Sequence, residues 1–516
     1  METGKESPAA VTLVATLTAP PGPEDADFAA PLADVAATSW LEVRGDLAGD
    51  LDPGPLRCGF AGKLLYTLRS RSESGAFEGS PERRKRRLIE AGERYDLVDL
   101  EAARDLSPDV LKAVPAEKRV LSWHGAATNV DGLKAIFERM AGVDAVLYKL
   151  IPTAVQAGDE IPPLQLLAGL ERCDVAAFAA GPVGAWTRLV APRLGAPVVY
   201  GALGPVPGAP GQITIRRLRE DFGLPELRPV ERLFGIVGSP IDHSLSPRLH
   251  NAAYRALGIP ALYLPFHAES FGDFWLEVVE SEVLEQIGLP VRGLSVTTPH
   301  KEAALAVAAA TSPRAELIGA ANTLVWKDGV WEGESTDPDG VVLPLVARGI
   351  DLAARCAAVV GAGGAGRSAA EGLAAAGASV TLVNRNAERG ERAAALLKLP
   401  FLPRDAFDPA AFDLLVNATT LGRGGDGADG ERGEELPFAV DRLRAGTVVV
   451  DLVYREAPTP LLRAAAERGP EAITVVDGRE VLLYQALGQI RMMTGREMPL
   501  DLGRAILGLE SLEPTS

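Results

Sequence analysis

Short runs of apolar and β-branched residues alternate with longer amphipathic segments through the first two hundred positions of the chain. Eight of these runs have the length and composition of buried strands. They are residues 11–17, 39–47, 63–70, 96–101, 119–125, 144–152, 174–181 and 197–203. The segments between them include helix patterns with an asparagine cap or a proline at the first turn. Eight alternations of strand and helix predict an α/β fold of the (β/α)8 TIM barrel type.

The second half of the chain contains a more specific pattern, in which an apolar strand leads into a glycine-rich turn, a helix and a second apolar strand over residues 356–386. The glycines in GxGxxG spacing are Gly361, Gly363 and Gly366. Such glycines permit a tight turn and the close approach of a pyrophosphate to the helix N-terminus. The second strand ends at Asn384, Arg385 and Asn386, with no acid to bind a ribose 2′-hydroxyl. Since a guanidinium suits a 2′-phosphate, the pattern predicts a Rossmann domain that binds NADP.

Composition and charge exclude several classes of protein. At about 100–200 residues per domain, a chain of 516 residues predicts about three domains. A net charge of −17 disfavours binding to nucleic acid or to an anionic membrane. No apolar run reaches the ~18 residues of a membrane span, and the N-terminus lacks a signal-peptide pattern. Three widely spaced cysteines support neither a disulfide framework nor a zinc site. We therefore expect a cytoplasmic protein that acts on small molecules and holds no metal.

Polar side chains gather at the C-terminal ends of the predicted barrel strands, where TIM barrels carry their chemistry. They are Glu42, Arg44, Asp46, Arg69, Glu101, His124 and Lys149. Lys149 has apolar neighbours in a buried strand, so desolvation would lower its pKa and favour an amine that attacks a carbonyl to form a Schiff base. His124, one strand earlier, could move protons around that imine. Taken singly, a lysine at a strand end commonly extends to solvent, and a lone histidine is commonly structural.

All of these residues except Glu101 lie in ordered pieces of sequence that resemble the type I 3-dehydroquinate dehydratases over about residues 8–225. The six pieces are LEVRGD, LRSRSESG, SWH, the Lys149 strand, the TR of AWTRL, and APGQI. The resemblance implies that Lys149 forms the imine, that His124 acts as general acid and base, and that Glu73 orients His124. It also implies that Arg188 binds the substrate carboxylate. The remaining substrate-binding side chains would be Glu42, Arg44, Arg69 and Gln212.

Some positions depart from the dehydratase pattern, and these departures affect the expected affinity for substrate rather than the imine and proton-transfer chemistry. Gly208 stands where the family has a serine, so a hydroxyl contact is lost, and Ser74 replaces a glycine after Glu73. The segment GAATN after His124 lacks the family's usual Asp-Phe and Thr-Pro. A chain in which only the second half is active is therefore an alternative.

Seven motifs around the glycine-rich unit resemble the shikimate dehydrogenases over about residues 232–512. They are GSPIDHSLSPRLHN, SVTTPHK, GAANT, STDPDG, NATTLG, DLVYREAPTPLL and the helix around Gln485. The resemblance implies that Lys301 and Asp337 form a pair that delivers a proton while the cofactor supplies hydride. Substrate contacts would come from Ser244, Ser246, Thr297, Asn322, Tyr454 and Gln485. Cofactor contacts would come from Gly361, Gly363, Gly364, Ala365, Gly366, Asn384, Arg385, Asn386, Asn417, Thr419, Val453 and Gly478.

This second part also departs from its family in places. Ser295 and Ser335 stand where asparagines are usual, Asn386 stands where a threonine is usual, and residues 479–480 are Arg-Glu where Leu-Pro is common. Helix capping and packing account for His243, His250 and His300 without a direct substrate role. The shorter serines are expected to shift substrate contacts.

Together the resemblances imply three domains: a dehydratase barrel over 1–228, a substrate-binding domain over 232–339 completed by 479–516, and an NADP-binding Rossmann domain over 340–478. The chain would convert 3-dehydroquinate to 3-dehydroshikimate and reduce that product to shikimate with NADPH. One alternative is a quinate/shikimate dehydrogenase, although Ser244 and Ser246 together favour shikimate. Another is a regulator that binds these ligands without catalysis, which the retained lysines oppose.

Overall fold

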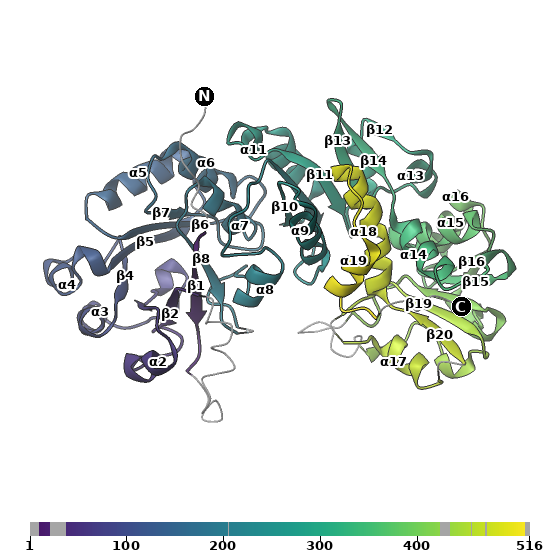
Figure 1. Cartoon of the computed structure of the whole chain (residues 1–516), viewed down its shortest axis with the longest axis horizontal. Coiled ribbons are helices and arrows are strands. Elements are labelled where there is room, and N and C mark those ends of the chain that lie inside the picture. The colour runs from purple at the N-terminus through teal and green to yellow at the C-terminus, as the bar shows by residue number, and fades with distance from the viewer. Residues whose placement is uncertain are drawn as a thin grey trace. The chain divides into compact units, whose positions relative to one another are not determined.

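The computed structural model describes residues 10–20, 38–204, 206–423, 434–455, 457–469 and 472–510, with helices and strands alternating along the chain (Figure 1). It divides into two compact units. One comprises Met1–Leu233 with Pro260–Val291, and the other comprises Phe234–Ile259 with Arg292–Ser516. Residues 1–9 of the predicted barrel domain and residues 511–516 of the segment predicted to complete the substrate-binding domain lie outside the described residues. The N-terminal stretch that lacks a signal-peptide pattern is mostly outside them as well.

Eight parallel strands form a nearly closed barrel in the first unit. They are β1 (Thr12–Leu17), β2 (Trp40–Arg44), β3 (Lys63–Thr67), β4 (Leu97–Glu101), β5 (Arg119–Ala126), β6 (Leu147–Thr153), β7 (Val175–Ala177) and β8 (Val198–Ala202). Their order is β7-β6-β5-β4-β3-β2-β1-β8. Each of the eight predicted runs overlaps one of these strands, so the predicted TIM barrel is confirmed.

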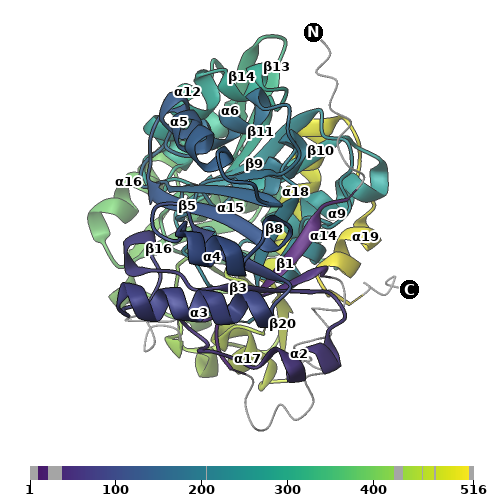
Figure 2. The same ribbon diagram turned by 90° about the vertical axis from the view of Figure 1, so that its left-hand side faces the viewer.

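Helices follow most of the barrel strands. They are α2 (Pro53–Gly59), α3 (Pro81–Arg94), α4 (Pro108–Ala113), α5 (Val130–Ala141), α6 (Ile161–Gly169), α7 (Thr187–Val190) and α8 (Ile215–Glu220). Local caps explain where two of them begin: the Ser80 side chain accepts from the Arg83 amide at the start of α3, and Asn129 accepts from the Gly132 amide at the start of α5. Figure 2 shows α3 and α4 outside the barrel strands.

A second, mixed sheet follows the barrel in sequence. Its strands are β9 (Arg232–Gly238), β10 (Ala261–His267), β11 (Val291–Val296), β12 (Ala310–Thr311), β13 (Thr323–Lys327) and β14 (Val330–Glu334), in the order β10-β9-β11-β13-β14-β12. The accompanying helices are α9 (Ser246–Leu257), α10 (Phe271–Phe274), α11 (Val283–Gln286), α12 (Lys301–Val307), α13 (Pro313–Ile318) and α14 (Asp337–Val346). Antiparallel pairing of β11 with β13 brings the loop before β13 to the end of β11.

The third sheet is parallel and doubly wound. Its strands are β15 (Cys356–Val360), β16 (Ser379–Asn384), β17 (Phe401–Pro403), β18 (Leu414–Asn417), β19 (Thr447–Asp451) and β20 (Ile473–Val476), in the order β17-β16-β15-β18-β19-β20. This is the strand order of a Rossmann domain, so the predicted βαβ unit is confirmed. The order reverses between β15 and β18, and ligands of such sheets bind beyond the strand ends at that point.

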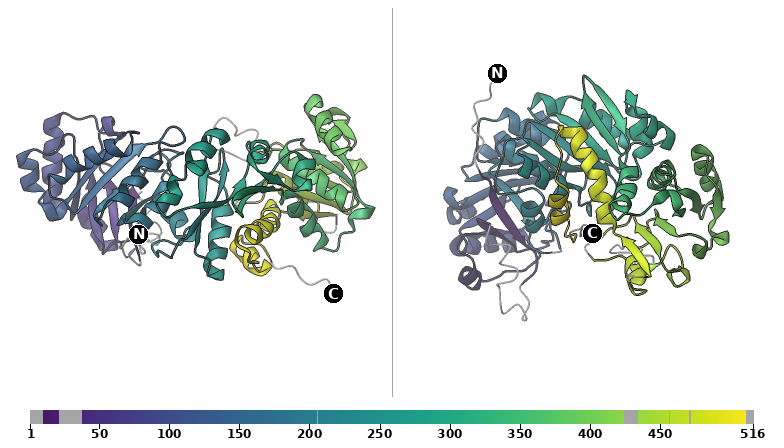
Figure 3. Two further views of the ribbon diagram at one scale, coloured as in Figure 1. Left: turned by 90° about the horizontal axis from the view of Figure 1, so that it is seen from above. Right: turned by 45° about the vertical axis from the view of Figure 1, so that its right-hand side comes forward.

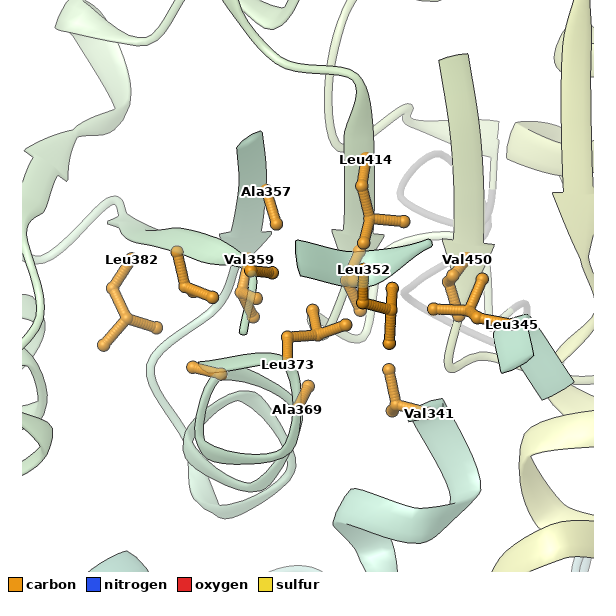
Figure 4. Close-up of a cluster of buried hydrophobic side chains, with 14 of the residues drawn as sticks. Val341, Leu345, Leu352, Ala357, Val359, Ala369, Leu373, Leu382, Leu414 and Val450 are labelled. Atoms are coloured by element: carbon orange, nitrogen blue, oxygen red, sulfur yellow. The ribbon is translucent and has the colours of Figure 1, made fainter. Parts of the chain in front are cut away.

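Helices α15 (Gly364–Ala375), α16 (Ala387–Leu397), α17 (Pro460–Ala466), α18 (Gly478–Thr494) and α19 (Leu500–Ile506) complete the second unit. Apolar residues of α14 and α15 pack on strands of the third sheet, as Figure 4 shows for Val341, Leu345 and Leu373. The helix α18, the long yellow helix in Figure 3, packs along α14. Since Asp337 is the first residue of α14, this packing holds it in place relative to the Rossmann sheet.

Candidate active sites

Lys149 lies inside the barrel and forms an ion pair with a carboxylate that the sequence analysis did not single out. Its Nζ is 2.9 Å from Asp99 Oδ2, and both side chains are at least nine-tenths buried. Asp99 Oδ1 accepts hydrogen bonds from Arg69, at 2.9 Å, and from Ser122. Burial raises the pKa of Asp99, but the Arg69 and Lys149 cations outweigh burial and hold that pKa below its usual range. Asp99 is therefore an ionised partner for the lysine.

His124 and Glu73 form the second pair of the barrel site. His124 Nδ1 lies 3.0 Å from Glu73 Oε2, and the same oxygen accepts the His124 backbone amide at 3.1 Å. Burial raises the pKa of Glu73 to about 7, while burial and the neighbouring Arg69 and Lys149 cations lower the pKa of His124 well below its usual value. When Glu73 is ionised, Nδ1 donates to it, so the neutral imidazole carries its lone pair on Nε2.

Arg69 joins these two pairs. Its Nη2 donates to Asp99 at 2.9 Å, and its Nη1 donates to Glu73 at 3.2 Å and to Ser122 Oγ at 2.8 Å. Burial alone would lower the pKa of Arg69, but the surrounding carboxylates raise it. The guanidinium predicted to hold substrate is thus engaged with the protein, where it fixes the spacing between Asp99 and Glu73.

A third group of polar side chains lies where β1, β2 and β3 meet the loop after β8. Glu42 accepts from Thr16 Oγ1 and from Thr67 Oγ1, each at 2.8 Å. Gln212 Nε2 donates to Thr16 Oγ1 at 2.9 Å, and Arg44 donates to the carbonyl of Gly208. These bonds place Glu42, Arg44 and Gln212 together, as the sequence analysis expected.

Gly208 has a local reason to be glycine. A Cβ at this position would lie 2.7 Å from Thr16 Cγ2 and 3.1 Å from Arg44 Nη1. The side chain of the serine found in the family would therefore require the loop or Thr16 to shift. Here the backbone of Gly208 takes part instead, because its amide donates to Gln212 Oε1 at 2.7 Å and its carbonyl accepts from Arg44.

Arg188 is a buried cation with no acidic partner among the described residues. Its side chain is 2% exposed, its guanidinium lies 5.2 Å from the centre of the Phe178 ring, and its Nε finds no acceptor among the described residues. Burial lowers its pKa to about 10. Because an unpaired buried charge is costly, a ligand carboxylate at this position would remove the penalty with charge-assisted hydrogen bonds.

Two residues of the barrel site were missed by sequence reasoning. Asp99 and Glu101 are two positions apart in a buried strand, so alternation places both on one face, and this spacing could have identified Asp99. Tyr200 on β8 lies with its ring centre 4.6 Å from Lys149 Nζ. No sequence signal distinguishes it, because an aromatic residue in a strand is ordinarily part of the core.

In the second unit, Lys301 and Asp337 form the predicted pair. Lys301 Nζ donates to Asp337 Oδ2, and Asn322 Nδ2 donates to Asp337 Oδ1 at 2.7 Å. Asn322 is held in turn, since its Oδ1 accepts from the Thr336 amide at 2.9 Å and from Thr323 Oγ1 at 2.8 Å. Three segments distant in sequence thus meet at one ammonium–carboxylate pair.

The remaining predicted substrate residues lie on segments of the same unit. Ser244 Oγ accepts from the Ser246 amide at 3.2 Å, and Tyr454 hydrogen-bonds with Ser244; burial raises the pKa of Tyr454 and these bonds offset part of that effect. Thr297 follows β11 and Gln485 lies on α18. Among the described residues, neither of these two side chains has a hydrogen-bond partner, so both are available to a ligand.

Ser295, at a position where asparagine is usual, is occupied by a protein contact. Its Oγ donates to Gln489 Oε1 at 2.9 Å, and Gln489 Nε2 donates to Thr323 Oγ1 at 3.2 Å. Gln489 lies one turn after Gln485 on α18, and the sequence analysis did not identify it. Nearby, His250 Nδ1 is 3.1 Å from the Tyr254 hydroxyl, and burial lowers the pKa of His250 to about 3. His250 is therefore neutral and serves packing on α9.

The glycine-rich turn has the backbone that a pyrophosphate requires. Gly361 has φ of +120°, in the region that favours glycine, and a Cβ at Gly366 would lie 2.0 Å from the Gly361 carbonyl oxygen. Gly364 begins α15, and a Cβ there would lie 3.4 Å from Lys301 Cδ. The first turn of α15 therefore lies beside the catalytic lysine candidate, and Ala365 follows in the same turn.

The end of β16 presents cationic side chains. Arg385 is exposed, while Asn386 caps α16 by accepting the Arg389 amide at 2.8 Å, and Asn384 donates to the Asn386 carbonyl at 2.8 Å. Asn386, at the position where a threonine is usual, is thus the N-cap of α16. Arg389 Nη2 lies 3.4 Å from the Cβ position of Gly363, a second cation that the analysis of the motif overlooked although it lies in the first turn after the cap.

Beyond β18 and β19, polar groups fix the loops on the other side of the turn. Asn417 Nδ2 donates to Asp451 Oδ1 at 2.8 Å, and Thr419 Oγ1 donates to Asn417 Oδ1 at 2.7 Å. Burial raises the pKa of Asp451 to about 6. A Cβ at Gly478 would lie 2.5 Å from the Val453 carbonyl oxygen, so α18 begins against this strand end. Asn417 therefore connects the loop after β18 to the end of β19 through hydrogen bonds within the protein.

No group of three or more metal-ligating side chains occurs among the described residues. No helix in the same ranges has the length and hydropathy to cross a membrane. The cysteines Cys58, Cys173 and Cys356 are exposed and unpaired.

Comparison with known proteins relates both halves of the chain to families. Residues 56–226 match the model of type I 3-dehydroquinase, and residues 236–324 match that of the shikimate dehydrogenase substrate binding domain. A chloroplastic bifunctional 3-dehydroquinate dehydratase/shikimate dehydrogenase of Arabidopsis thaliana is 29% identical over 463 residues, which cover 85% of this chain and 74% of that protein.

Relatives of the second half alone are also found. A shikimate dehydrogenase (NADP(+)) of Maridesulfovibrio salexigens is 36% identical over 284 residues, covering 55% of this chain and 98% of that protein. The crystal structure of a Thermus thermophilus shikimate 5-dehydrogenase with NADP(H) and shikimate is 32% identical, with a TM-score of 0.47, covering 54% of this chain and 98% of that one. The chain therefore belongs to the shikimate dehydrogenase family and carries a type I 3-dehydroquinase domain before it, the combination found in bifunctional 3-dehydroquinate dehydratase/shikimate dehydrogenases.

Proposed function

We propose that this chain catalyses two consecutive reactions of the shikimate pathway. The barrel dehydrates 3-dehydroquinate to 3-dehydroshikimate, and the second unit reduces 3-dehydroshikimate to shikimate with NADPH. The observation that carries this proposal is the presence of two separate lysine–carboxylate pairs, Lys149 with Asp99 and Lys301 with Asp337, one in each unit. A chain active only as a dehydrogenase is disfavoured, because the barrel retains a complete set of lysine, histidine and oriented carboxylate.

In the barrel, Lys149 Nζ passes a proton to His124 Nε2 and attacks the ketone carbon of the substrate. His124 returns that proton to the departing oxygen, which leaves as water, and a protonated imine remains. His124 Nε2 then removes a proton from the carbon next to the imine and returns it to the departing hydroxyl, which leaves as water. Hydrolysis of the imine releases product and regenerates the lysine. Glu73 holds His124 in the tautomer that this step needs.

Substrate binding in the barrel rests on charge and on hydroxyl partners. Arg188, whose Nε lacks an acceptor among the described residues, binds the substrate carboxylate. Glu42, Arg44 and Gln212 hold the hydroxyls beneath the loop that carries Gly208. Arg69 acts mainly through Glu73 and Asp99, since its guanidinium is committed to them.

In the second unit, the Lys301 ammonium donates a proton to the substrate carbonyl oxygen as it becomes a hydroxyl, and Asp337 keeps that ammonium in place. NADPH supplies the hydride when bound. Ser244, Ser246 and Tyr454 hold the substrate carboxylate. The ring hydroxyls are held by Thr297, Asn322 and Gln485. Quinate is not the favoured substrate, and a lack of quinate oxidation by the purified protein would support this.

The residues of the third sheet fit NADP. The close Cβ positions show that only glycine fits at Gly361 and Gly366, and this tight turn leads directly into the N-terminus of α15, where a pyrophosphate would bind. Arg385 and Arg389 supply positive charge for a 2′-phosphate, with Asn384 and Asn386 shaping the turn. Asn417, Thr419, Val453 and Gly478, at the ends of β18 and β19 and the start of α18, would contribute the remaining cofactor contacts.

The proposal keeps the domain limits expected from the sequence: 1–228 for the dehydratase barrel, 232–339 with 479–516 for the substrate-binding domain, and 340–478 for the NADP-binding domain. It also keeps a cytoplasmic location, which the three exposed, unpaired cysteines favour because a reducing compartment preserves free thiols.

Separate assays of the two halves test the proposal. Purified full-length protein is given 3-dehydroquinate without nicotinamide, and ultraviolet absorbance reports the conjugated enone of 3-dehydroshikimate. A second sample receives 3-dehydroshikimate and NADPH, and loss of NADPH absorbance reports reduction. We expect both signals. Absence of the enone in the presence of normal reduction would refute the dehydratase assignment.

We expect dehydratase activity to fall on the acid side of pH 7. The pKa of Glu73 is raised to about 7, so acidification below that value protonates Glu73 and removes the acceptor for His124 Nδ1. Glu73→Gln should lower kcat/KM at pH 8 by about 10²-fold or more and remove the inflection near pH 7. Measurement of kcat/KM against pH for both proteins checks this, with the dehydrogenase profile as internal control. An unchanged inflection in the variant would assign it to another group.

Cofactor preference provides a second test. Arg385→Ala should weaken NADPH binding by about 10- to 100-fold, the loss expected for a charge-assisted contact of roughly 1.5–3 kcal/mol, and leave NADH binding unchanged. Arg392→Ala is the matched control, because Arg392 is an exposed arginine on α16 that pairs with Glu388 at 3.6 Å. Calorimetric titration with each nucleotide measures the effect. Equal losses for NADPH and NADH would contradict a role in binding the 2′-phosphate.

A further inference from the structure

The Lys149 ammonium has an aromatic neighbour as well as an acidic one. Tyr200 lies on β8, at the opposite end of the strand order from β7 and β6, and its ring centre is 4.6 Å from Lys149 Nζ. The tyrosine side chain is 5% exposed, as is the lysine. Lys149 Nζ is therefore a buried cation with the Asp99 carboxylate 2.9 Å away and an aromatic face as a further partner.

The ring, rather than the hydroxyl, is the part of Tyr200 that is engaged. The Tyr200 hydroxyl is buried and finds no hydrogen-bond partner among the described residues. Burial and the nearby Glu42 and Asp99 charges raise the pKa of this phenol well above its usual value, so it is neutral. Its removal would break no hydrogen bond within the described protein, which makes phenylalanine a matched control for the ring.

An aromatic face suits the chemistry proposed for this nitrogen. A cation over a ring is attracted by the ring's negative face, and the attraction grows when water is excluded. An ammonium has three N–H bonds to offer, whereas a protonated imine on the same nitrogen retains one. The aromatic face needs no N–H donor, so it continues to stabilise the positive charge after the imine has formed.

We propose that the ring of Tyr200 stabilises the cationic nitrogen of the Lys149 imine and is thereby a further catalytic residue of the barrel. The inference rests on the proposed dehydratase function. Because the ring also faces the ammonium of the free lysine, it favours the reaction to the extent that the imine cation, with fewer N–H bonds to offer other partners, depends on the ring more than the ammonium does. The benefit lasts while the nitrogen keeps positive charge during removal of the proton from the adjacent carbon. The contribution of one buried cation–π contact corresponds to about a three- to thirty-fold effect on imine formation and on kcat/KM.

The test uses the full-length protein and compares Tyr200→Leu with Tyr200→Phe. Each protein is mixed with 3-dehydroquinate and sodium borohydride, and intact-protein mass spectrometry measures the fraction of chains that carry a reduced adduct on Lys149. We expect Tyr200→Leu to lower the trapped fraction at subsaturating substrate and kcat/KM by about three- to thirty-fold, and Tyr200→Phe to stay within about twofold of wild type. The rate of 3-dehydroshikimate reduction reports whether the second unit of each variant has folded.

A fluorinated phenylalanine at position 200 keeps the inference testable if the leucine variant does not fold. Fluorination withdraws charge from the ring face at nearly constant shape, so trapping and kcat/KM should fall relative to Tyr200→Phe. Equal values for the fluorinated and ordinary phenylalanine proteins would overturn the inference, as would an equal loss in Tyr200→Phe and Tyr200→Leu. Failure of the wild-type protein to form any adduct would overturn the proposed imine chemistry itself, and the inference with it.

Discussion

Replacement of Lys149 by alanine should abolish the dehydration of 3-dehydroquinate and leave the reduction of 3-dehydroshikimate unchanged. The side chain supplies the nucleophile, and loss of a covalent catalyst removes a reaction path that the remaining groups cannot restore. We expect kcat to fall by about 10⁴-fold or more, in line with the removal of nucleophiles from other enzymes. Enone formation measures the loss, and borohydride trapping should give no adduct.

A second lysine in the barrel provides the control for this experiment. Lys63, at the start of β3, is exposed and contacts the Trp40 ring at 5.7 Å, away from the Asp99 pair. Lys63→Ala should retain both activities and the borohydride adduct. Dehydratase activity in Lys149→Ala within tenfold of wild type would contradict a covalent mechanism at this residue.

Replacement of Lys301 by alanine should have the opposite effect, with loss of 3-dehydroshikimate reduction and normal dehydration of 3-dehydroquinate. The ammonium supplies the proton as the carbonyl becomes a hydroxyl, so we expect the rate of 3-dehydroshikimate reduction to fall by about 10²- to 10⁴-fold. Enone formation in the barrel should remain normal. Asp337→Asn should lower the reduction rate as well, because Asp337 Oδ2 accepts from Lys301 and a neutral amide leaves that ammonium without its counter-charge. Loss of NADPH absorbance with added 3-dehydroshikimate measures both variants.

Lys327→Ala serves as the matched control in the second unit, since Lys327 is exposed at the end of β13 and pairs with Glu332 at 3.6 Å. It should reduce 3-dehydroshikimate at the wild-type rate. A Lys301→Ala protein with normal reduction but weaker NADPH binding would assign Lys301 to the cofactor, next to Gly364, rather than to proton delivery.

The periodicity of apolar residues was enough to predict the TIM barrel, and the spacing of the glycines was enough to predict the Rossmann domain. Each apolar run of the first half is bounded by turns and helices, so the position of each strand could be predicted. The length of a strand was less certain: the run 174–181 is longer than β7, which spans only Val175–Ala177. The Rossmann unit was identified because its glycines, helix and second strand follow one another within a single local segment. Local patterns of this kind do not depend on how distant segments pack.

The contacts within the sites depend on that distant packing and were harder to predict. Lys149 was expected among apolar neighbours alone, whereas the parallel pairing of β4, β5 and β6 brings Asp99 within 2.9 Å of its nitrogen. Tyr200 comes from a strand fifty residues later and meets Lys149 only because the barrel curves round. Strand register and closure decide such contacts, and a single sequence does not state them.

One departure from the family pattern has a physical explanation that the sequence did not suggest. Glu480, where proline is common, is buried on α18 and lies between two arginines. Arg504 Nη1 donates to it at 2.8 Å and Arg348 Nη2 lies at 2.6 Å. A buried carboxylate is tolerable when it is paired in this way, so the two arginines account for a glutamate at the start of this helix.

The most direct test of the account is a single reaction of the purified protein with 3-dehydroquinate and NADPH, in which NADPH absorbance and the organic products are followed together. The account predicts oxidation of NADPH in an amount equal to the 3-dehydroquinate consumed, with shikimate as product and no other enzyme added. Formation of enone without oxidation of NADPH, or no reaction from 3-dehydroquinate in a sample that still reduces 3-dehydroshikimate, would contradict the claim that one chain performs both steps.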